Sequence, residues 1–233
     1  MAATGAYTDG TYLQANPLWH VEESPWKAEQ VLRALHRNRL TPRVIGEVGC
    51  GAGEILIQLH DRMDQECLFI GYEISPQAFE LCQSRARERI TFRLADILQE
   101  KAEHFDLILV MDVIEHLEDY FGFLRGIRDR ADYKIFHFPL DLSVQTIVRP
   151  DGLMRVRRMY RHLHYFTKDM ALAILEETGY ELKDWFYTAR AIDMPSDVLS
   201  RRLLRLPRRA AFAIHHDLTV RLLGGYSLLV VAS

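Results

Sequence analysis

A strand-like run followed by three closely spaced glycines constrains the fold of this chain more than any other stretch. Residues 44–48 form a short, mostly β-branched run, and glycine then occupies positions 49, 51 and 53. When a strand enters a helix through such a turn, backbone N–H groups face a ligand, and glycine leaves no Cβ in the way. The turn therefore predicts a site for a nucleotide-like ligand, although an ordinary tight turn would also explain the glycines.

The spacing of these glycines narrows the choice of ligand. Dinucleotide-binding folds carry G-x-G-x-x-G, in which the third glycine lets the helix pack closely on the strand. Here the pattern is G-x-G-x-G, Glu47 precedes it, and position 54 is a glutamate. A nicotinamide-dependent oxidoreductase is therefore the weaker interpretation, although Glu73, about 20 residues further on, would suit it.

Strand-like and helix-like segments alternate along the whole chain. We expect strands at 44–48, 67–73, 90–94, 105–110, 132–138, 180–189 and 226–232. Helical patterns cover about 24–38, 53–63, 76–87, 113–127, 167–178 and 194–223, and residues 139–166 are expected to be irregular. This alternation predicts an α/β fold with right-handed crossovers and helices on both faces of a parallel sheet. The last two strands, separated only by a helical excursion, predict an antiparallel pair.

Several residues mark the expected ends of these helices. Ser24 and Ser75, each followed by proline, are predicted N-caps, as is Thr167. Gly179 is placed to end the helix that Thr167 begins. Pro207 is expected to split the basic, amphipathic 194–223 segment, which we interpret as a lid; a membrane surface or a partner is the alternative.

Composition excludes several classes of protein. The 233 residues carry a formal net charge of −3, so nucleic acid is not an expected partner. No apolar run approaches the ~18 residues of a membrane span, and no secretory leader is visible. The three cysteines (Cys50, Cys67 and Cys82) lack a metal-like spacing and suit a reduced, cytoplasmic setting. The oligomeric state does not follow from the sequence.

Four short motifs stand at the ends of the first four strands. They are Glu47–Gly53 (EVGCGAG), Gly71–Ser75 (GYEIS), Leu94–Ile97 (LADI) and Leu109–Leu117 (LVMDVIEHL). Together they resemble the motifs of class I S-adenosylmethionine-dependent methyltransferases, in particular small-molecule enzymes of the ubiquinone-biosynthesis type. The resemblance covers about 41–189 and the final strand.

The resemblance implies a Rossmann-like, seven-stranded sheet in the order 3-2-1-4-5-7-6, with strand seven antiparallel. It also implies S-adenosylmethionine as the methyl donor and S-adenosylhomocysteine as the product. We expect a single domain over 1–233, divided into an N-terminal strap and helix (1–40), a cofactor-binding core (41–189), a helical lid (190–223) and a last strand (224–233).

The chemistry of this donor suggests a role for each motif. Its carboxylate suits the turn formed by Gly49, Cys50, Gly51 and Gly53 and the helix that follows. A ribose diol needs a bidentate acceptor, which Glu73 offers at the end of strand two. Glu73 could instead be a solvated acid at a strand end.

Further donor contacts are expected from neighbouring strand ends. Asp96 would accept a hydrogen bond from the adenine amino group, or simply cap a helix. Ile74 and Ile97 would sandwich the adenine ring, although core packing would also explain them. Met111 and Asp112 follow strand four, where the strand ends open to a ligand. Glu47 would order the donor's amine, or be a sheet-edge acid.

The aromatic N-terminal segment is interpreted as a strap over the cofactor. An aromatic face beside the sulfonium is favourable, and Tyr7, Tyr12, Trp19 and His20 could supply one. A disordered tail is the alternative.

Four histidines are candidate general bases for the acceptor: His116, His137, His162 and His164. Each could instead have a structural role. In an extended segment His162 and His164 would share a face, but no third ligand has a convincing spacing, so no metal site is predicted.

The acceptor is predicted to be a small molecule. Relatives that methylate amides or nucleobases carry an Asn/Asp-Pro-Pro-aromatic motif after strand four, and this chain does not. Arginine forks bind carboxylate or phosphate, so Arg157, Arg158 and Arg161, with Tyr165 nearby, suggest an acidic acceptor. A solvated basic loop is the alternative. The acceptor itself does not follow from the sequence, and a non-catalytic regulatory homologue stays an alternative function.

Overall fold

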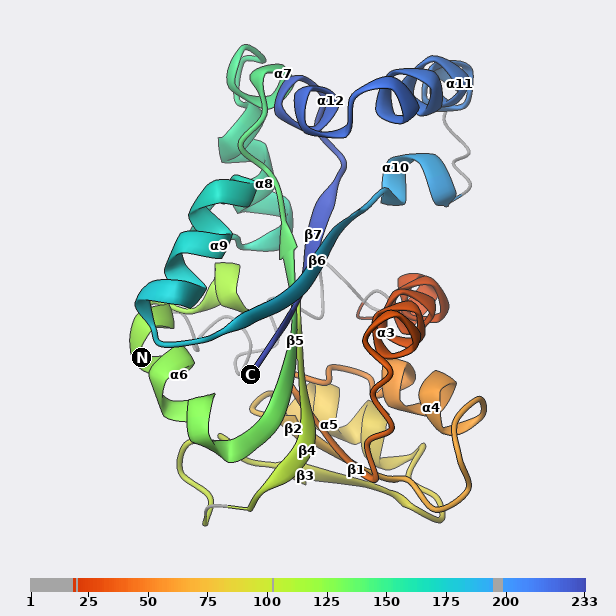
Figure 1. Ribbon diagram of the computed structural model, residues 1–233, viewed down its shortest axis with the longest axis vertical. Coiled ribbons are helices and arrows are strands. Elements are labelled where there is room, and N and C mark those ends of the chain that lie inside the picture. The colour runs from red at the N-terminus through yellow and green to blue at the C-terminus, as the bar shows by residue number, and fades with distance from the viewer. Residues whose placement is uncertain (1–18, 20, 102, 195–198) are drawn as a thin grey trace.

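A seven-stranded sheet forms the centre of the computed structural model, which describes residues 19, 21–101, 103–194 and 199–233 (Figure 1). The strands are β1 (Val44–Val48), β2 (Leu68–Glu73), β3 (Ile90–Leu94), β4 (Phe105–Met111), β5 (Ala131–Pro139), β6 (Leu182–Thr188) and β7 (Ser227–Ala232). They are ordered β3-β2-β1-β4-β5-β7-β6. Strands β1 to β5 pair in parallel, and β7 runs antiparallel between β5 and β6. The predicted strand order and the antiparallel seventh strand are confirmed.

Strand β4 shows why this sheet is covered on both sides. Every residue of β4 except Asp106 is buried, as a parallel strand between two helical layers requires. Successive side chains point to opposite faces. Leu107 and Leu109 therefore join one hydrophobic core, and Ile108 and Val110 join the other.

The helices divide between these two cores. Helices α3 (Ser24–Asn38) and α4 (Glu54–His60) pack on the face of Leu107, and α5 (Pro76–Gln83) contacts β2 and β3. Helices α6 (Tyr120–Ile127) and α9 (Lys168–Glu177) pack on the opposite face (Figure 1). The prediction of helices on both faces is confirmed.

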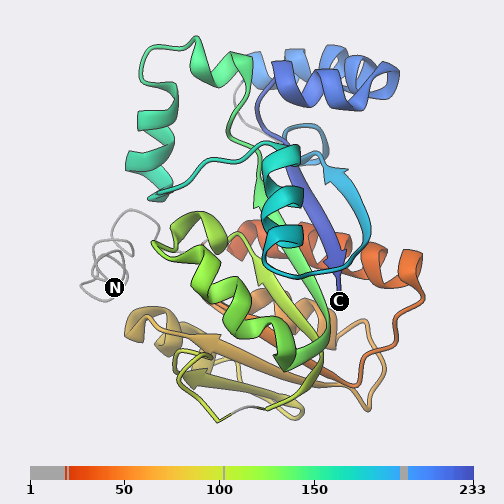
Figure 2. The same cartoon turned by 60° about the vertical axis from the view of Figure 1, so that its left-hand side comes forward.

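Two groups of helices lie at one end of the molecule (Figure 2). Helices α7 (Val144–Ile147) and α8 (Gly152–Tyr160) follow β5. Helices α10 (Arg190–Asp193), α11 (Leu199–Ile214) and α12 (His216–Leu222) connect β6 to β7. No helix in the described part of the chain is both long and apolar enough to span a bilayer.

Two predicted segments differ from the structure. Residues 139–166 were expected to be irregular, but they contain α7 and α8. Helix α8 contains Arg155, Arg157 and Arg158 and buries no side chain, so its sequence resembles a basic, exposed loop. The single helix expected at 113–127 is a 3₁₀ turn, η3 (Ile114–His116), followed by α6. The chain is extended at Leu117, and the Asp119 carboxylate caps α6 by accepting from the Gly122 N–H at 2.8 Å.

The predicted helix ends are partly confirmed. Ser75 caps α5, Thr167 caps α9, and Gly179 follows α9 with a left-handed φ of 92°. The expected cap at Ser24 is wrong, because Glu23 precedes α3 as its N-cap and Ser24 is the first helical residue. The expected break at Pro207 is also wrong. Pro207 lies inside α11, and the break falls at His215, whose ring caps α12.

Candidate active site

A cavity of about 1080 Å³ lies at the carboxyl ends of the parallel strands. Val48, Glu73, Met111 and Pro139, at the ends of β1, β2, β4 and β5, all contribute to its wall. The structure brings most of the predicted site residues to this cavity: Trp19, Glu47, Gly49, Cys50, Gly51, Glu73, Ile74, Asp96, Ile97, Met111, Asp112, His116, His137 and His162. Predicted Tyr12 and His20, together with Tyr7, lie outside the described residues.

The glycine turn has the left-handed backbone that only glycine adopts easily. The φ angles of Gly49, Gly51 and Gly53 are 66°, 54° and 77°. A Cβ on Gly53 would approach the Phe92 ring to 2.5 Å, whereas one on Gly51 would meet nothing closer than Trp19 at 3.7 Å. Gly53 is thus required by packing against the core, and Gly51 leaves its side of the cavity open.

The N–H groups of this turn are largely engaged inside the protein. Those of Gly49 and Cys50 donate to the Tyr72 carbonyl at 2.8 and 3.1 Å, and that of Gly53 donates to the Cys50 carbonyl at 2.8 Å. The Gly51 N–H donates to the Glu73 carboxylate at 2.8 Å. The expectation that these N–H groups lie bare for a ligand carboxylate is therefore wrong. The turn instead fixes the position of Glu73.

Glu73 is held rigidly in the cavity wall. One carboxylate oxygen accepts from Gly51, and the other accepts from the N–H groups of Ile74 and Ser75 at 2.9 and 2.8 Å. Burial raises the pKa of Glu73 even though these hydrogen bonds oppose the shift. Three of the four lone-pair positions of this carboxylate are thus occupied, and the oxygen that accepts from Gly51 has one position left for a ligand.

Glu47 is a buried acid with one uncommitted oxygen. It is 1% exposed, and its Oε2 has no hydrogen-bond partner among the described residues. Burial raises its pKa well above the ordinary value, although the charge of Lys27 opposes this. A buried polar atom without a partner is rare and indicates a ligand or ordered water.

The other residues that were predicted to contact the methyl donor form the adjoining wall. Asp96 accepts from the Leu98 N–H at 2.9 Å, which keeps the turn after β3 compact. Ile97 is fully buried, whereas Ile74 is 38% exposed. We refer to Glu47, Gly49–Ala52, Glu73, Ile74, Asp96 and Ile97 as the glycine-loop half of the cavity. The predicted site residue Gly53 ends this turn but does not line the cavity.

A chain of buried and partly buried polar side chains begins the opposite wall. Lys27 Nζ lies 2.6 Å from Asp112 Oδ2, and Asp112 Oδ1 lies 2.5 Å from His137 Nδ1. His137 Nε2 lies 2.9 Å from the Thr188 hydroxyl, so both ring nitrogens of His137 are engaged. Burial alone would raise the pKa of Asp112, but His137 and Lys27 hold it well below its ordinary value. Asp112 is therefore an ionised group with its partners in place.

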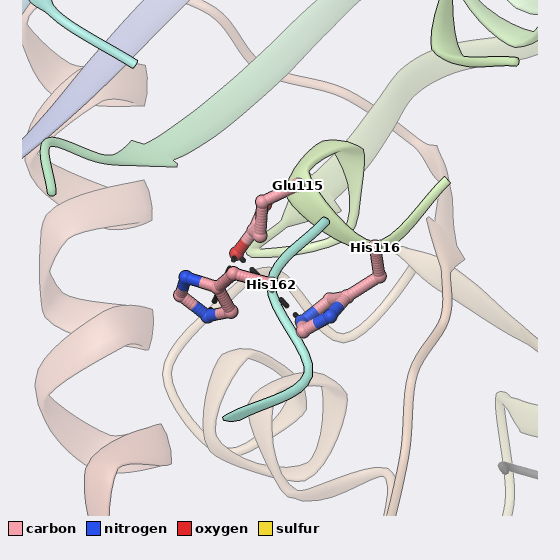
Figure 3. A group of neighbouring side chains, drawn as sticks. All are labelled: Glu115, His116 and His162. Atoms are coloured by element: carbon pink, nitrogen blue, oxygen red, sulfur yellow. Dashed lines mark ion pairs between the residues drawn. The ribbon is translucent and has the colours of Figure 1, made fainter. Parts of the chain in front are cut away.

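A second group on the same wall contains Glu115, His116 and His162 (Figure 3). Glu115 Oε1 lies 3.9 Å from His116 Nε2 and 4.0 Å from His162 Nε2. Burial raises the pKa of Glu115 well above its ordinary value, and it lowers that of His116 to about 3. His162 Nδ1 lies 2.7 Å from Asp141 Oδ2. We refer to Lys27, Asp112, Glu115, His116, His137, Asp141 and His162 as the histidine half.

Some predicted residues lie away from the cavity wall. His164 packs against Tyr120, and the Tyr165 hydroxyl donates to the Leu153 carbonyl. The three arginines predicted to hold an acidic acceptor belong to α8 and its end, and none lines the cavity. Arg158 pairs with Asp151 at the surface, and Arg157 contacts the Leu163 carbonyl at 3.5 Å. Arg161 contributes its backbone carbonyl, which lies 3.3 Å from His116 Nδ1.

Three residues of the histidine half were not predicted from the sequence: Lys27, Glu115 and Asp141. Lys27 stands beside Ala28 in the apolar stripe of α3, which was a usable signal for a buried charge. Glu115 directly precedes His116, so the two share one short turn. Asp141 lies in a loop and carries no local signal of its own.

The family model for a methyltransferase domain matches residues 43–195, and these include all four motifs. The chain belongs to this methyltransferase-domain family. The predicted family is thereby confirmed.

Known members of the methyltransferases match this chain at modest identity. A ubiquinone biosynthesis O-methyltransferase from Azorhizobium caulinodans is 29% identical over 134 residues, 55% of this chain and 44% of the relative. An ajmaline N-methyltransferase from Rauvolfia serpentina is 32% identical over 91 residues, 36% of this chain and 31% of the relative. The chain thus spans less than half the length of these two relatives.

Solved structures support the fold of this methyltransferase domain. Magnesium protoporphyrin IX methyltransferase from Synechocystis PCC 6803, with bound S-adenosylhomocysteine, superposes with a TM-score of 0.58. It covers 89% of this chain and 81% of its own, at 18% identity. At that identity the similarity shows the Rossmann-like methyltransferase fold alone.

Proposed function

We propose that this chain is an S-adenosylmethionine-dependent methyltransferase that acts on a small-molecule acceptor. The observation that carries the proposal is the row of acids in the glycine-loop half. Glu47, Glu73 and Asp96 stand at or beside the ends of β1, β2 and β3, and all three line one cavity. The family and the solved relative with bound S-adenosylhomocysteine support the same donor.

The residues present fit the parts of this donor. The fixed Glu73 carboxylate would accept from the ribose diol through its remaining lone-pair position, and Asp96 would accept from the adenine amino group. Ile74 and Ile97 provide the apolar surface that an adenine ring needs. The uncommitted oxygen of Glu47 would accept from the donor's ammonium group. Trp19 lines the cavity beside Gly51, as the proposed aromatic strap requires.

When bound, the donor supplies a methyl group activated by a sulfonium. The protein's contribution is to align the acceptor with that carbon and to exclude water. The acceptor's lone pair forms the new bond to the methyl carbon, and the electron pair of the broken S–C bond stays on sulfur. A hydroxyl acceptor must also give up its proton, so activating groups are needed beside it.

We propose that the acceptor is activated in the histidine half. Of the four predicted bases, His137 is engaged through both nitrogens, and His164 lies off the cavity wall. His116 and His162 line the cavity beside Glu115. We place the acceptor's hydroxyl against these three side chains.

The proposed acceptor is not required to be acidic. Among the described residues that line the cavity, the lysine and arginine side chains are those of Lys27 and Arg190. Lys27 pairs with Asp112, and Arg190 pairs with Glu23. A carboxylate or phosphate on the acceptor would have to displace one of these carboxylates, so we propose a neutral hydroxyl or phenol.

Ligand-dependent stability tests the donor assignment. At ~100 times its Kd, S-adenosylmethionine should stabilise the protein by about 2.7 kcal/mol, which corresponds to roughly 5–10 °C for a chain of this size. E73Q should weaken donor binding by about 10- to 100-fold, because the charged acceptor for the ribose hydroxyls is lost and the carboxylate that the backbone N–H groups hold in place is replaced by an amide. E80Q, on the exposed face of α5, is the matched control and should bind as the parent does. Stabilisation by NAD and not by S-adenosylmethionine would contradict the proposal.

Transfer of a labelled methyl group tests catalysis separately. A panel of phenols, alcohols and amines should give labelled product with a hydroxyl-bearing member. A protein that binds the donor tightly but transfers no label to any class of acceptor would be a non-catalytic homologue.

A further inference from the structure

Glu115, His116 and His162 converge from two parts of the chain (Figure 3). Glu115 and His116 belong to η3 after β4, and His162 lies in the loop after α8. One ligand atom from each of the three side chains can be chosen so that all lie within 4.8 Å of one another. Atoms bound to a common zinc-type ion, with bonds of about 2.0–2.2 Å, lie roughly 3–4 Å apart. Small side-chain rotations would therefore bring all three onto one ion.

The backbone holds these two segments together. The N–H groups of Leu163 and His164 donate to the Glu115 carbonyl at 2.8 and 3.1 Å. The Arg161 carbonyl lies 3.3 Å from His116 Nδ1. The loop that carries His162 is thus attached to η3 on both sides of His162. The convergence of the three side chains is a built feature of the fold.

Glu115 lacks the hydrogen bonds that a buried carboxyl group requires. Its side chain is fully buried, and neither carboxylate oxygen has a hydrogen-bond partner among the described residues. Leaving such a group unsatisfied costs ~1–3 kcal/mol or more. A cation between Glu115 and the two imidazoles would remove this cost.

The two imidazoles are oriented as metal ligands are. A backbone carbonyl can only accept a hydrogen bond, so the contact with Arg161 places the proton of a neutral His116 on Nδ1. The Asp141 carboxylate does the same for His162, at 2.7 Å. Each Nε2 is then the nitrogen with a lone pair, and the two lie 3.9 and 4.0 Å from Glu115 Oε1. A carboxylate or carbonyl behind each histidine is the usual outer arrangement of metal sites.

We propose that Glu115, His116 and His162 bind one divalent metal ion of the zinc type. Two imidazoles and one carboxylate suit Zn²⁺ and similar first-row ions, whereas Mg²⁺ prefers oxygen ligands. Asp112 is not a fourth ligand, because Lys27 and His137 already occupy its carboxylate. Three protein ligands leave a coordination position open, as catalytic zinc sites do. All three ligands line the cavity, so that position faces the acceptor.

The role of the ion, unlike its binding, rests on the proposed function. An acceptor hydroxyl at the open position would lose its proton to solvent more easily, because a bound cation lowers the pKa of a coordinated oxygen. That oxygen would then form the bond to the methyl carbon as the S–C bond breaks. The metal would thus replace a histidine general base.

Cobalt substitution tests the site without an activity assay. After removal of metal with a chelator, titration with Co²⁺ should give visible absorption bands that saturate at one equivalent, and calorimetry with Zn²⁺ should give the same stoichiometry. E115Q and H162N should each abolish the saturable bands. D141N should weaken Zn²⁺ binding by ~10- to 100-fold, since Asp141 orients His162. H104A, which removes an exposed histidine paired with Asp132, is the matched control and should bind one equivalent.

The donor titration separates this inference from the proposed function. Metal-free E115Q should bind S-adenosylmethionine as the metal-free parent does, which also shows that the variant is folded. Failure of the parent to bind S-adenosylmethionine would remove the proposed function and leave the metal site standing. Absence of saturable Co²⁺ and Zn²⁺ binding by the parent, or equal binding by the parent, E115Q and H162N, would overturn the metal site.

Discussion

The two halves of the cavity are built in different ways. In the glycine-loop half, Glu73 takes its hydrogen bonds from three backbone N–H groups on its own strand end and the neighbouring one. In the histidine half, side chains from α3, η3, β5 and the loop after α8 contact one another. One half is therefore held by the sheet itself, and the other by contacts between distant segments.

The geometry of the glycine-loop half depends on backbone conformation, whereas that of the histidine half depends on charge. The glycine-loop half needs backbone angles that only glycine adopts easily, at positions 49, 51 and 53. The histidine half needs buried charges that balance one another, such as Lys27 and Asp112. Changes to backbone shape should damage the first half most, and changes to charge should damage the second.

The largest loss of stability is expected for the substitution G53A. Its new Cβ would lie 2.5 Å from the Phe92 ring and 3.0 Å from the Cys82 Cβ, at a φ of 77°. Backbone strain of about 1–2 kcal/mol and overpacking of about 1–3 kcal/mol should together lower the free energy of unfolding by roughly 2–5 kcal/mol. Urea unfolding measures the change.

G51A is the matched comparison, because the backbone strain is similar but the added Cβ meets only Trp19, at 3.7 Å. It should lose about 1–2 kcal/mol while weakening donor binding, since the methyl group enters the cavity. Equal destabilisation by both variants would show that packing against Phe92 is not what requires Gly53.

The same division explains how much of the fold could be predicted from the sequence. Each strand is a local pattern of apolar residues, so β1 and β3 were predicted to the residue and the other strands to within two residues. Helix α8 was missed because its three arginines and its lack of buried side chains resemble a basic, exposed loop. The expected helix at 113–127 was too long because a cap at Asp119 outweighs a continuous apolar stripe.

The site shows a similar limit. Glu47, Glu73 and Asp96 could be predicted because each follows from its own strand and motif. In the histidine half, Asp112, His116, His137 and His162 were predicted as single residues. Their contacts could not be predicted, because no local pattern tells which of several histidines meets Glu115 or Asp141. Lys27 and Asp112 are 85 residues apart in the printed sequence, and only the packing of α3 on the sheet brings them together. The arginines of α8 looked like a binding group because sequence does not show which way an exposed helix faces.

The next largest effect is expected for K27M, which removes the cation from the histidine half. The Lys27 side chain is 12% exposed, and although burial opposes its charge, Asp112 and Glu23 raise its pKa above the ordinary value. Without Lys27, the Asp112 carboxylate keeps His137 but loses its charged partner. Breaking a largely buried pair in this way should cost about 3 kcal/mol, measured by urea unfolding.

R62M is the matched surface change. Arg62 pairs with Glu29 at 3.1 Å, with the two side chains 36% and 65% exposed. Its loss should cost less than about 1 kcal/mol. If K27M proved no more destabilising than R62M, the ion pair with Asp112 would not be what holds the histidine half.

The smallest expected effect is a change in how stability depends on pH, and it comes from Glu47, the buried acid of the glycine-loop half. Burial raises the folded-state pKa of Glu47; the charge of Lys27 opposes this shift, and the charge of Glu73 reinforces it. The stability that this group contributes is therefore fully present below its unfolded pKa of about 4.3 and is lost as pH rises through its raised folded value. E47Q carries no titrating proton, so relative to the parent it should become more stable as pH rises from 4.5 to 8.

Thermal unfolding of the donor-free protein across this range measures the effect, and the gain at pH 8 should be a few degrees. E66Q, at an exposed position, should follow the parent at every pH. The same E47Q substitution should weaken S-adenosylmethionine binding, because the oxygen proposed to accept from the donor's ammonium is replaced by an amide. Glu47 would then lower the stability of the empty protein in return for donor binding. An E47Q variant that gained no stability at pH 8 would show that Glu47 is not strained by burial, and that its uncommitted oxygen is satisfied by ordered water.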